Sequence, residues 1–267
     1  MYAATGIQFM QINSLVQLFA AQQSTPETLQ AARSLLTIPD LFHFWLTGVA
    51  ACEYTNATTT QMFDAKARDW ARPLLERLGI PSHFLQPVIE PGTEVGKWHD
   101  VPVVVPACHD TGSAVAAINL GPKTAYISSG TWSLMGVELL QPLINEEARR
   151  LNFTNEGGVC GTTRFLKNIM GMWLLQSCRQ QWLAEGRTYD YADLVALGKP
   201  APSLTSLIDP DDACFFHPGN MPETIRTFCK KQASRRRTNR PNSFSASLRA
   251  LRLNTGTFLN RFAALPE

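Results

Sequence analysis

A short segment of the sequence places an acid between a predicted strand and a predicted helix. Val101–Val105 is typical of a short buried strand, the run HDTGS follows at His109–Ser113, and small residues over Ala114–Leu120 indicate a helix start. Active sites of parallel sheets lie beyond the carboxyl ends of the strands, where Asp110 can accept a proton from a substrate hydroxyl. The alternative is an ordinary helix cap, a frequent role of Asp that contributes roughly 1 kcal/mol.

A second candidate is a turn rich in hydroxyls and glycine, SSGTWS at Ser128–Ser133. It joins two predicted strands, Lys123–Ser128 and Trp132–Val137. Its backbone N–H groups and hydroxyls are suited to holding phosphate oxygens. The alternative is an ordinary hairpin turn, in which Gly and Ser serve as turn formers. No G-K-[ST] follows, so the segment is not a Walker A loop.

Two polar residues fall in the segment that most favours a helix, Leu166–Glu185, which Gly186 can end. Its apolar face is formed by Leu166, Ile169, Met170, Trp173 and Leu174. Asn168 and Gln176 are eight positions apart, which at ~100° per residue leaves them ~80° apart on a helix, facing one ligand or facing solvent. Asn155–Gly158 (NEGG) either positions a polar substrate or makes a tight turn.

The histidines and cysteines argue against metal and thiol chemistry. None of the five histidines has metal-ligand spacing with a cysteine or with another histidine, so we expect no metal site. Cys108 and His109 are adjacent, whereas a nucleophile and its base normally come from separate segments. The six cysteines are widely spaced and lack a C-x-x-C pair, which indicates reduced thiols.

The elements that must position these residues form an α/β pattern, with strands followed by helices. The sequence predicts helices over residues 13–36, 39–48 and 69–78, a loop or edge strand over 55–60, and a turn-rich boundary between two units over 87–96. No apolar run is long enough for a membrane span and no charged leader is visible. We therefore expect a cytoplasmic protein.

The net charge of +2 conceals two unlike parts. Residues 1–223 contain 14 Lys and Arg against 21 Asp and Glu, whereas the last 44 residues contain ten bases and one acid. Beyond about residue 231 the hydrophobic pattern ends, which predicts a disordered segment. A basic tail of this kind also suits nucleic-acid binding, but its few aromatic residues offer little for base stacking.

Taken in order, these segments resemble the rhamnulokinases of the FGGY carbohydrate kinase family. Each motif is weak alone, but their order along most of the chain indicates the family. The motifs are TGIQF at 5–9, PD at 39–40, LTG at 46–48, EYTNATTTQ at 53–61, HDT at 109–111, SSGTWSLMG at 128–136, NEGG at 155–158 and LKNIMG at 166–171.

The resemblance implies an actin/hexokinase-like (ribonuclease H-like) kinase with two domains, which uses ATP and Mg²⁺ to phosphorylate the 1-hydroxyl of L-rhamnulose. It also implies roles for single residues: Asp110 as catalytic base, His109, Asp110, Thr111 and Asn168 at the sugar, Thr131 at the ATP phosphates and Gln176 at the nucleotide. Phosphoryl transfer needs such a base and a set of donors around the phosphates.

The resemblance covers only part of the family pattern. The glycine-rich hairpin that opens the first domain and the glycine turn at the adenosine are not found. We therefore expect two truncated domains, 1–98 and 99–231, followed by a basic tail at 232–267 that is disordered or frameshifted. Whether this chain is active alone stays open, with a non-catalytic remnant or sugar-binding module as the alternative and a nucleic-acid binder as the less favoured one.

Overall fold

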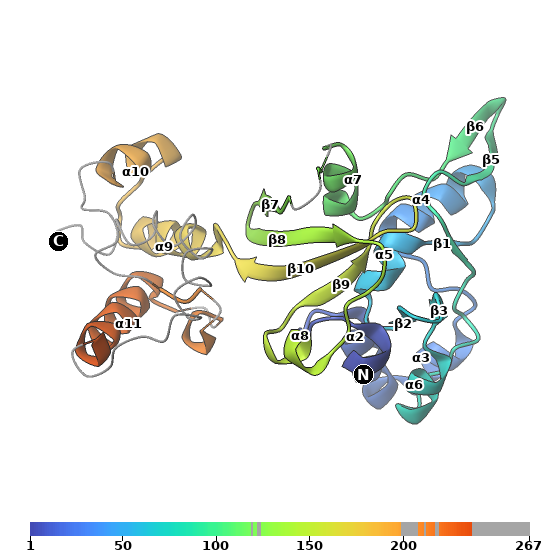
Figure 1. Ribbon diagram of the computed structural model, residues 1–267, viewed down its shortest axis with the longest axis horizontal. Helices are drawn as coiled ribbons and strands as arrows, with labels where there is room; N and C mark the ends of the chain where they lie inside the picture. Colours follow the sequence, from blue (N-terminus) through green and yellow to red (C-terminus); the bar gives the residue numbers. More distant parts are fainter. Residues whose placement is uncertain (119, 122–123, 199–207, 211, 217–218, 237–267) are drawn as a thin grey trace. The chain divides into compact units, whose positions relative to one another are not determined.

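The computed structural model describes residues 1–118, 120–121, 124–198, 208–210, 212–216 and 219–236 (Figure 1). Contacts between Cα atoms divide the chain into two compact units. Unit 1 contains Met1–Ser128 and Leu134–Asn168, and unit 2 contains Ser129–Ser133 and the chain from Ile169 onward. This division by contacts differs from the predicted domains, whose boundary at 98/99 lies inside unit 1.

The first part of unit 1 is mainly helical. Its helices are α1 (Tyr2–Thr5), α2 (Ser14–Ser24), α3 (Pro26–Ala31), α4 (Ile38–Thr47), α5 (Tyr54–Thr59) and α6 (Arg72–Arg77). The predicted helices at 13–36, 39–48 and 69–78 are present in large part, but residues 32–36 are not helical and Asp69–Trp70 forms strand β3. A capping box between Thr37 and Asp40 begins α4, and Gly48 ends it in the left-handed conformation with φ 73°.

The prediction of a loop or edge strand at 55–60 is wrong, because α5 covers Tyr54–Thr59. The threonine-rich run favours extended structure by propensity. Two local hydrogen bonds override this preference: the Glu53 carboxylate accepts from the backbone N–H groups of Thr55 and Asn56 and so caps the helix. Helix α5 packs against strand β9 of the same unit.

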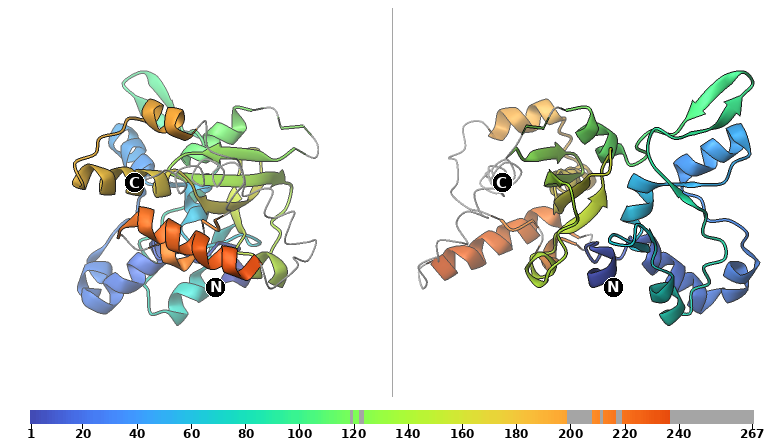
Figure 2. Two further views of the ribbon diagram at one scale, coloured as in Figure 1. Left: turned by 90° about the vertical axis from the view of Figure 1, so that its left-hand side faces the viewer. Right: turned by 45° about the vertical axis from the view of Figure 1, so that its right-hand side comes forward.

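Three two-stranded sheets surround these helices. Strand β1 (Cys52–Glu53) pairs in parallel with β4 (Val88–Ile89), β2 (Phe63–Asp64) pairs antiparallel with β3, and β5 (Glu94–Trp98) pairs antiparallel with β6 (Val101–Val104). The β5–β6 hairpin lies beside α4, as the right-hand view of Figure 2 shows. The predicted strand at Val101 exists, but it is largely exposed rather than buried, because its sheet has no other strand.

The largest sheet has four strands in the order β7-β8-β10-β9 (Figure 1). They are β7 (Tyr126–Ser129), β8 (Trp132–Leu139), β9 (Thr154–Gly157) and β10 (Thr163–Met170). Helix α7 (Asp110–Ala116) precedes β7, and α8 (Glu146–Arg150) lies between β8 and β9 in the chain. The strands predicted on either side of the turn at 128–133 are confirmed.

The predicted helix at 166–185 is wrong in its first part, where Leu166–Met170 completes strand β10 and Asn168 therefore lies on a strand. The apolar residues fit both periods, and the place of β10 between β8 and β9 in the sheet decides for the strand. Gly171 separates strand from helix: a Cβ there would lie 2.6 Å from the Gly130 carbonyl oxygen. Helix α9 then runs over Trp173–Ala184, so Gln176 is helical as predicted.

The rest of unit 2 contains α10 (Tyr191–Gly198), the short helix η1 (Ala213–Phe215) and α11 (Met221–Arg236). Helix α11 extends to Arg236, five residues into the predicted tail. The remainder of that tail, 237–267, lies outside the described residues. No described helix is both long enough and apolar enough to cross a membrane.

Each unit has its own apolar core. The core of unit 1 is formed by Leu15, Leu29, Cys52, Tyr54, Ala57, Met62, Phe63, Trp70, Leu75, Ile80, Phe84 and Leu85. The core of unit 2 is formed by Met170, Leu174, Leu175, Cys178, Trp182, Leu194, Ile208, Phe215, Met221 and Ile225. A smaller cluster of Val115, Tyr126 and Leu166 holds α7 against the large sheet within unit 1.

Truncating Phe63 should destabilise unit 1 strongly. Its ring is 1% exposed and lies 5.5 Å from the Tyr54 ring and 6.2 Å from that of Trp70. We expect Phe63→Ala to lower the free energy of unfolding by about 3–5 kcal/mol, in urea titrations followed by tryptophan fluorescence. Phe42→Ala, which removes a ring from a residue that is 56% exposed, is the matched control and should have a small effect. Equal losses in the two variants would contradict this account of the core.

Candidate active site

Asp110 is the first residue of α7, and its side chain is 97% exposed. One carboxylate oxygen accepts hydrogen bonds from the Thr111 backbone N–H at 2.6 Å and from the Thr111 hydroxyl at 3.3 Å. The expectation that Asp110 follows a strand of a parallel sheet is wrong, because β6 belongs to an antiparallel hairpin. The start of α7 presents the carboxylate instead, and leaves its other oxygen accessible to a substrate.

The backbone just before Asp110 is held by Glu53, which is fully buried. The Glu53 carboxylate accepts from the Cys108 N–H at 3.0 Å and from the Thr55 hydroxyl at 2.6 Å. The Thr55 oxygen in turn accepts from the His109 N–H at 3.1 Å. The loop that carries the predicted base is therefore fixed to the N-terminal end of α5 by a chain of buried hydrogen bonds.

Burial raises the pKa of Glu53, because the charged form loses its hydration. The donors from Thr55, Asn56 and Cys108 act in the opposite direction, since they stabilise the carboxylate. Four hydrogen bonds from these three residues replace the lost water. The Glu53 carboxylate therefore serves as a shared hydrogen-bond acceptor inside unit 1.

A buried ion pair lies under His109. Arg164 on β10 and Glu156 on β9 are directly opposite across the antiparallel pair. Their side chains are 0% and 8% exposed, and Arg164 Nη2 lies 3.1 Å from a Glu156 oxygen. Arg164 Nε also donates to the Gly157 carbonyl at 2.9 Å. These contacts fix the guanidinium, whose Nη2 then lies 3.2 Å from Nδ1 of His109.

The arginine sets the state of the His109 ring. A guanidinium only donates, so Nδ1 must accept and the ring proton lies on Nε2. Burial lowers the pKa of His109, with Arg164 acting in the same direction while Glu156 and Asp110 oppose it. A neutral ring with Nε2–H is a hydrogen-bond donor suited to a sugar hydroxyl.

Asn168 lies on β10, where its amide donates to the Gln8 side-chain oxygen at 3.2 Å. Gln8 is buried, and its backbone N–H donates to the Thr154 hydroxyl at 3.3 Å. The Asn13 amide donates to the Gln8 carbonyl at 2.9 Å. The residue predicted at the sugar is thus positioned by the segment after α1, within the same unit.

Thr131 and Gln176, both predicted at the nucleotide, come together in unit 2. The Gln176 amide lies 3.4 Å from the Thr131 hydroxyl. The Thr131 carbonyl accepts from the N–H groups of Gly171 and Trp173, which ties the turn after β7 to the start of α9. The sequence pairs these residues only through the family resemblance, because they are 45 positions apart.

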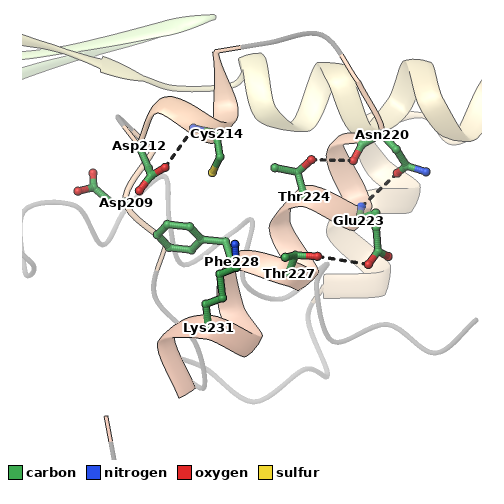
Figure 3. Close-up of a pocket in the computed structure, with 9 residues that line it drawn as sticks. All are labelled: Asp209, Asp212, Cys214, Asn220, Glu223, Thr224, Thr227, Phe228 and Lys231. Carbon is green, nitrogen blue, oxygen red and sulfur yellow. Dashed lines mark hydrogen bonds between the residues drawn. The ribbon is translucent and has the colours of Figure 1, made fainter. Parts of the chain in front are cut away.

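Unit 2 also contains a pocket of about 650 Å³ between η1 and α11 (Figure 3). Three acids and one lysine are among its lining residues, which are Asp209, Asp212, Cys214, Asn220, Glu223, Thr224, Thr227, Phe228 and Lys231. None of the predicted site residues lines it. Several of its polar groups are already bonded to one another, such as the Glu223 N–H to the Asn220 side chain at 3.1 Å.

Comparison with known proteins identifies the family. Residues 1–104 match the N-terminal domain of the FGGY family of carbohydrate kinases, and residues 125–264 match its C-terminal domain. The second match alone covers more than half of the chain. The chain belongs to this family. The C-terminal match reaches into the segment 232–267, which the sequence analysis separated as a tail.

Relatives within the FGGY family are similar over most of this chain. A rhamnulokinase of Halalkalibacterium halodurans is 43% identical over 86% of the chain and 50% of the relative. One of Pectobacterium atrosepticum is 44% identical over 86% of the chain and 47% of the relative. The chain therefore spans about half the length of the curated relatives it matches.

Solved sugar-kinase structures show the same fold. A ligand-bound xylulose kinase of Lactobacillus acidophilus has a TM-score of 0.66 at 15% identity, covering 98% of this chain and 65% of that one. A carbohydrate kinase of Novosphingobium aromaticivorans has a TM-score of 0.57 at 21% identity, covering 96% and 60%. The chain thus contains part of the actin/hexokinase-like fold that the sequence predicted.

Sequence reasoning missed the buried residues that support the candidate site in unit 1. Glu53 and Thr55 lie in the quoted motif at 53–61, but nothing in the pattern indicated a contact with residue 108. Arg164 carried no signal, because a single arginine has no spacing that indicates a buried ion pair. Glu156 was noted only as part of a possible turn, yet it pairs with Arg164 on a strand.

Removing Arg164 should be costly, because it leaves Glu156 buried without its partner. We expect Arg164→Met to lower the free energy of unfolding by about 3–5 kcal/mol in urea titrations. The double variant with Glu156→Gln should recover part of that loss. Arg149→Met removes a similar pair on the exposed surface of α8 and is the matched control, with little expected change. A double variant less stable than Arg164→Met would contradict the buried-charge explanation.

Proposed function

We propose that this chain carries the sugar-phosphorylating site of a rhamnulokinase, which transfers the γ-phosphoryl group of ATP to the 1-hydroxyl of L-rhamnulose. The curated relatives named as rhamnulokinases support the choice of sugar. The observation that carries the proposal is the exposed Asp110 carboxylate beside the neutral, donating ring of His109. Because the chain spans about half of those relatives, the activity is proposed for this chain rather than taken over from them.

In the proposed reaction Asp110 is the general base. The free oxygen of Asp110 accepts the proton of the sugar 1-hydroxyl as the hydroxyl oxygen forms a bond to the γ-phosphorus. The bond from the γ-phosphorus to the bridging oxygen breaks, ADP leaves, and the proton passes from Asp110 to solvent. His109 Nε2–H, the Thr111 hydroxyl and the Asn168 amide hold the sugar hydroxyls, which orients the reacting oxygen.

Thr131 and Gln176 are the proposed nucleotide contacts. The Thr131 hydroxyl and the Gln176 amide can form hydrogen bonds with the nucleotide. They are not proposed as metal ligands, because Mg²⁺ prefers several hard oxygen ligands. In this proposal Mg²⁺ arrives with ATP, coordinated by its phosphate oxygens, and is part of the substrate. Because ATP is held in the cytoplasm, the proposed reaction is cytoplasmic.

The proposal also assigns the two domains. Residues 1–98 are the later part of the first FGGY domain and residues 99–231 the first half of the second. The two family matches support this division, because one ends at residue 104 and the other begins at residue 125.

Asp110→Asn tests the base directly. Asparagine keeps an oxygen that accepts from the Thr111 N–H but cannot take up the substrate proton. We expect the rate of L-rhamnulose-dependent ADP formation, measured in a coupled assay with Mg²⁺ and ATP, to fall about 10²–10⁴-fold. Circular dichroism and the midpoint of urea unfolding should stay unchanged.

The matched control is Asp100→Asn, which neutralises an exposed acid in the turn of the β5–β6 hairpin and should keep the wild-type rate. Full activity of Asp110→Asn would rule out its role as base. Absence of any sugar-dependent ADP formation by the wild-type chain would contradict the proposed activity of this chain.

A further inference from the structure

Three potential metal ligands from distant parts of the sequence meet in unit 1. Asp40 and His43 lie three positions apart on α4, and therefore on the same face of the helix. Cys108 lies in the loop before α7. One carboxylate oxygen, one imidazole nitrogen and the thiol sulfur all lie within 4.8 Å of one another.

We propose that Asp40, His43 and Cys108 bind a divalent transition-metal ion such as Zn²⁺. Sulfur, nitrogen and oxygen ligands together are typical of zinc sites and of their Co²⁺ substitutes, whereas Mg²⁺ and Ca²⁺ take oxygen ligands. Ligand atoms around a tetrahedral zinc ion stand about 3.4–3.8 Å apart.

Strong donors occupy three of the acceptor positions of the Asp40 carboxylate. One oxygen accepts from the Thr37 hydroxyl at 2.6 Å and from the Thr37 N–H at 3.3 Å. The other accepts from the Glu53 N–H at 3.0 Å. A carboxylate offers about four acceptor positions, and the fourth faces the Cys52 thiol, a weak donor that a metal ion would displace. The hydrogen bonds also hold Asp40 in place, as second-shell partners of metal ligands do.

The charges of this region favour a cation. Asp40 is 1% exposed and Glu53 is 0% exposed, and within the described residues neither carboxylate forms an ion pair. Both lie close to Cys108, because the Glu53 carboxylate accepts from the Cys108 N–H at 3.0 Å and an Asp40 oxygen lies within 4.8 Å of the Cys108 sulfur. Buried charges are normally paired or bound to metals. On binding, the thiol proton leaves to solvent as the sulfur–metal bond forms.

The ion would add a direct bond between two segments that Glu53 already links, because its N–H donates to Asp40 and its carboxylate accepts from the Cys108 N–H. Cys108 directly precedes His109 and Asp110, so a metal bond from its sulfur to α4 would fix the loop that carries the proposed base. Three protein ligands leave a fourth position for water, as in open zinc sites. The site does not depend on the proposed kinase activity.

Cobalt binding to the full chain tests the proposal. The chain is reduced with a phosphine, and Co²⁺ is added while the absorption spectrum is recorded. We expect one equivalent to give a thiolate-to-cobalt charge-transfer band and the visible bands of a tetrahedral site. Zn²⁺ should displace the cobalt and excess Mg²⁺ should not.

Variants assign the ligands. Cys108→Ser should abolish the charge-transfer band and weaken cobalt binding at least about 100-fold, and His43→Gln should keep the band but weaken binding at least about 10-fold. Cys160→Ser removes an exposed cysteine elsewhere and is the matched control, with unchanged binding. Circular dichroism checks the fold of each variant. If Cys108→Ser does not fold, cobalt binding by His43→Gln decides the test.

The outcomes that overturn the proposal are equally defined. A wild-type chain without a thiolate-to-cobalt band has no such site. A band that persists in Cys108→Ser, or binding unchanged in His43→Gln, assigns the metal to other groups. Displacement of cobalt by Mg²⁺ would indicate an oxygen-only site and contradict the proposed ligands.

Discussion

The buried carboxylate of Glu53 is the interaction on which the site in unit 1 depends. A fully buried acid is costly unless donors replace its water, and here four hydrogen bonds do so. Two come from the backbone of α5 and begin that helix, and a third, from Cys108, fixes the loop before α7. One side chain thus determines both where α5 starts and where the His109–Asp110 backbone lies. The exposed Asp110 side chain needs few contacts of its own, because Glu53 fixes the backbone that precedes it.

The Arg164–Glu156 pair completes this support from the large sheet. Cross-strand register places the two residues opposite each other. Because both are buried, either charge would be costly without the other. The guanidinium is then available to His109 Nδ1 in one fixed orientation, which leaves Nε2–H as a donor. Two buried polar networks, one at α5 and one between β9 and β10, therefore meet at Cys108 and His109, directly before Asp110. Preorganisation of this kind is what phosphoryl transfer requires of a protein, since the reaction needs positioning more than covalent help.

The sequence predicted those features that local patterns control. Pro39-Asp40 and Gly48 bounded α4, and the glycine turn at 129–131 separated β7 from β8. The sequence did not predict features that depend on contacts between residues far apart in the chain. The run Tyr54–Thr59 is helical because Glu53 caps it, and Leu166–Met170 belongs to a strand because β10 lies between β8 and β9 in the sheet. Glu53, Arg164 and the meeting of His43 with Cys108 were not predictable, because only the fold brings these residues together.

The central claim is that Glu53 holds the loop before Asp110, and amide hydrogen exchange in the Glu53→Gln variant tests it most directly. Glutamine presents an N–H₂ group to donors that need an acceptor, at a cost of about 1–3 kcal/mol. We expect exchange of the Cys108 amide to accelerate about 5–150-fold relative to that of Ala71, which donates to the Met62 carbonyl elsewhere in the same unit. Equal changes at Cys108 and Ala71, or no change at Cys108, would contradict the account.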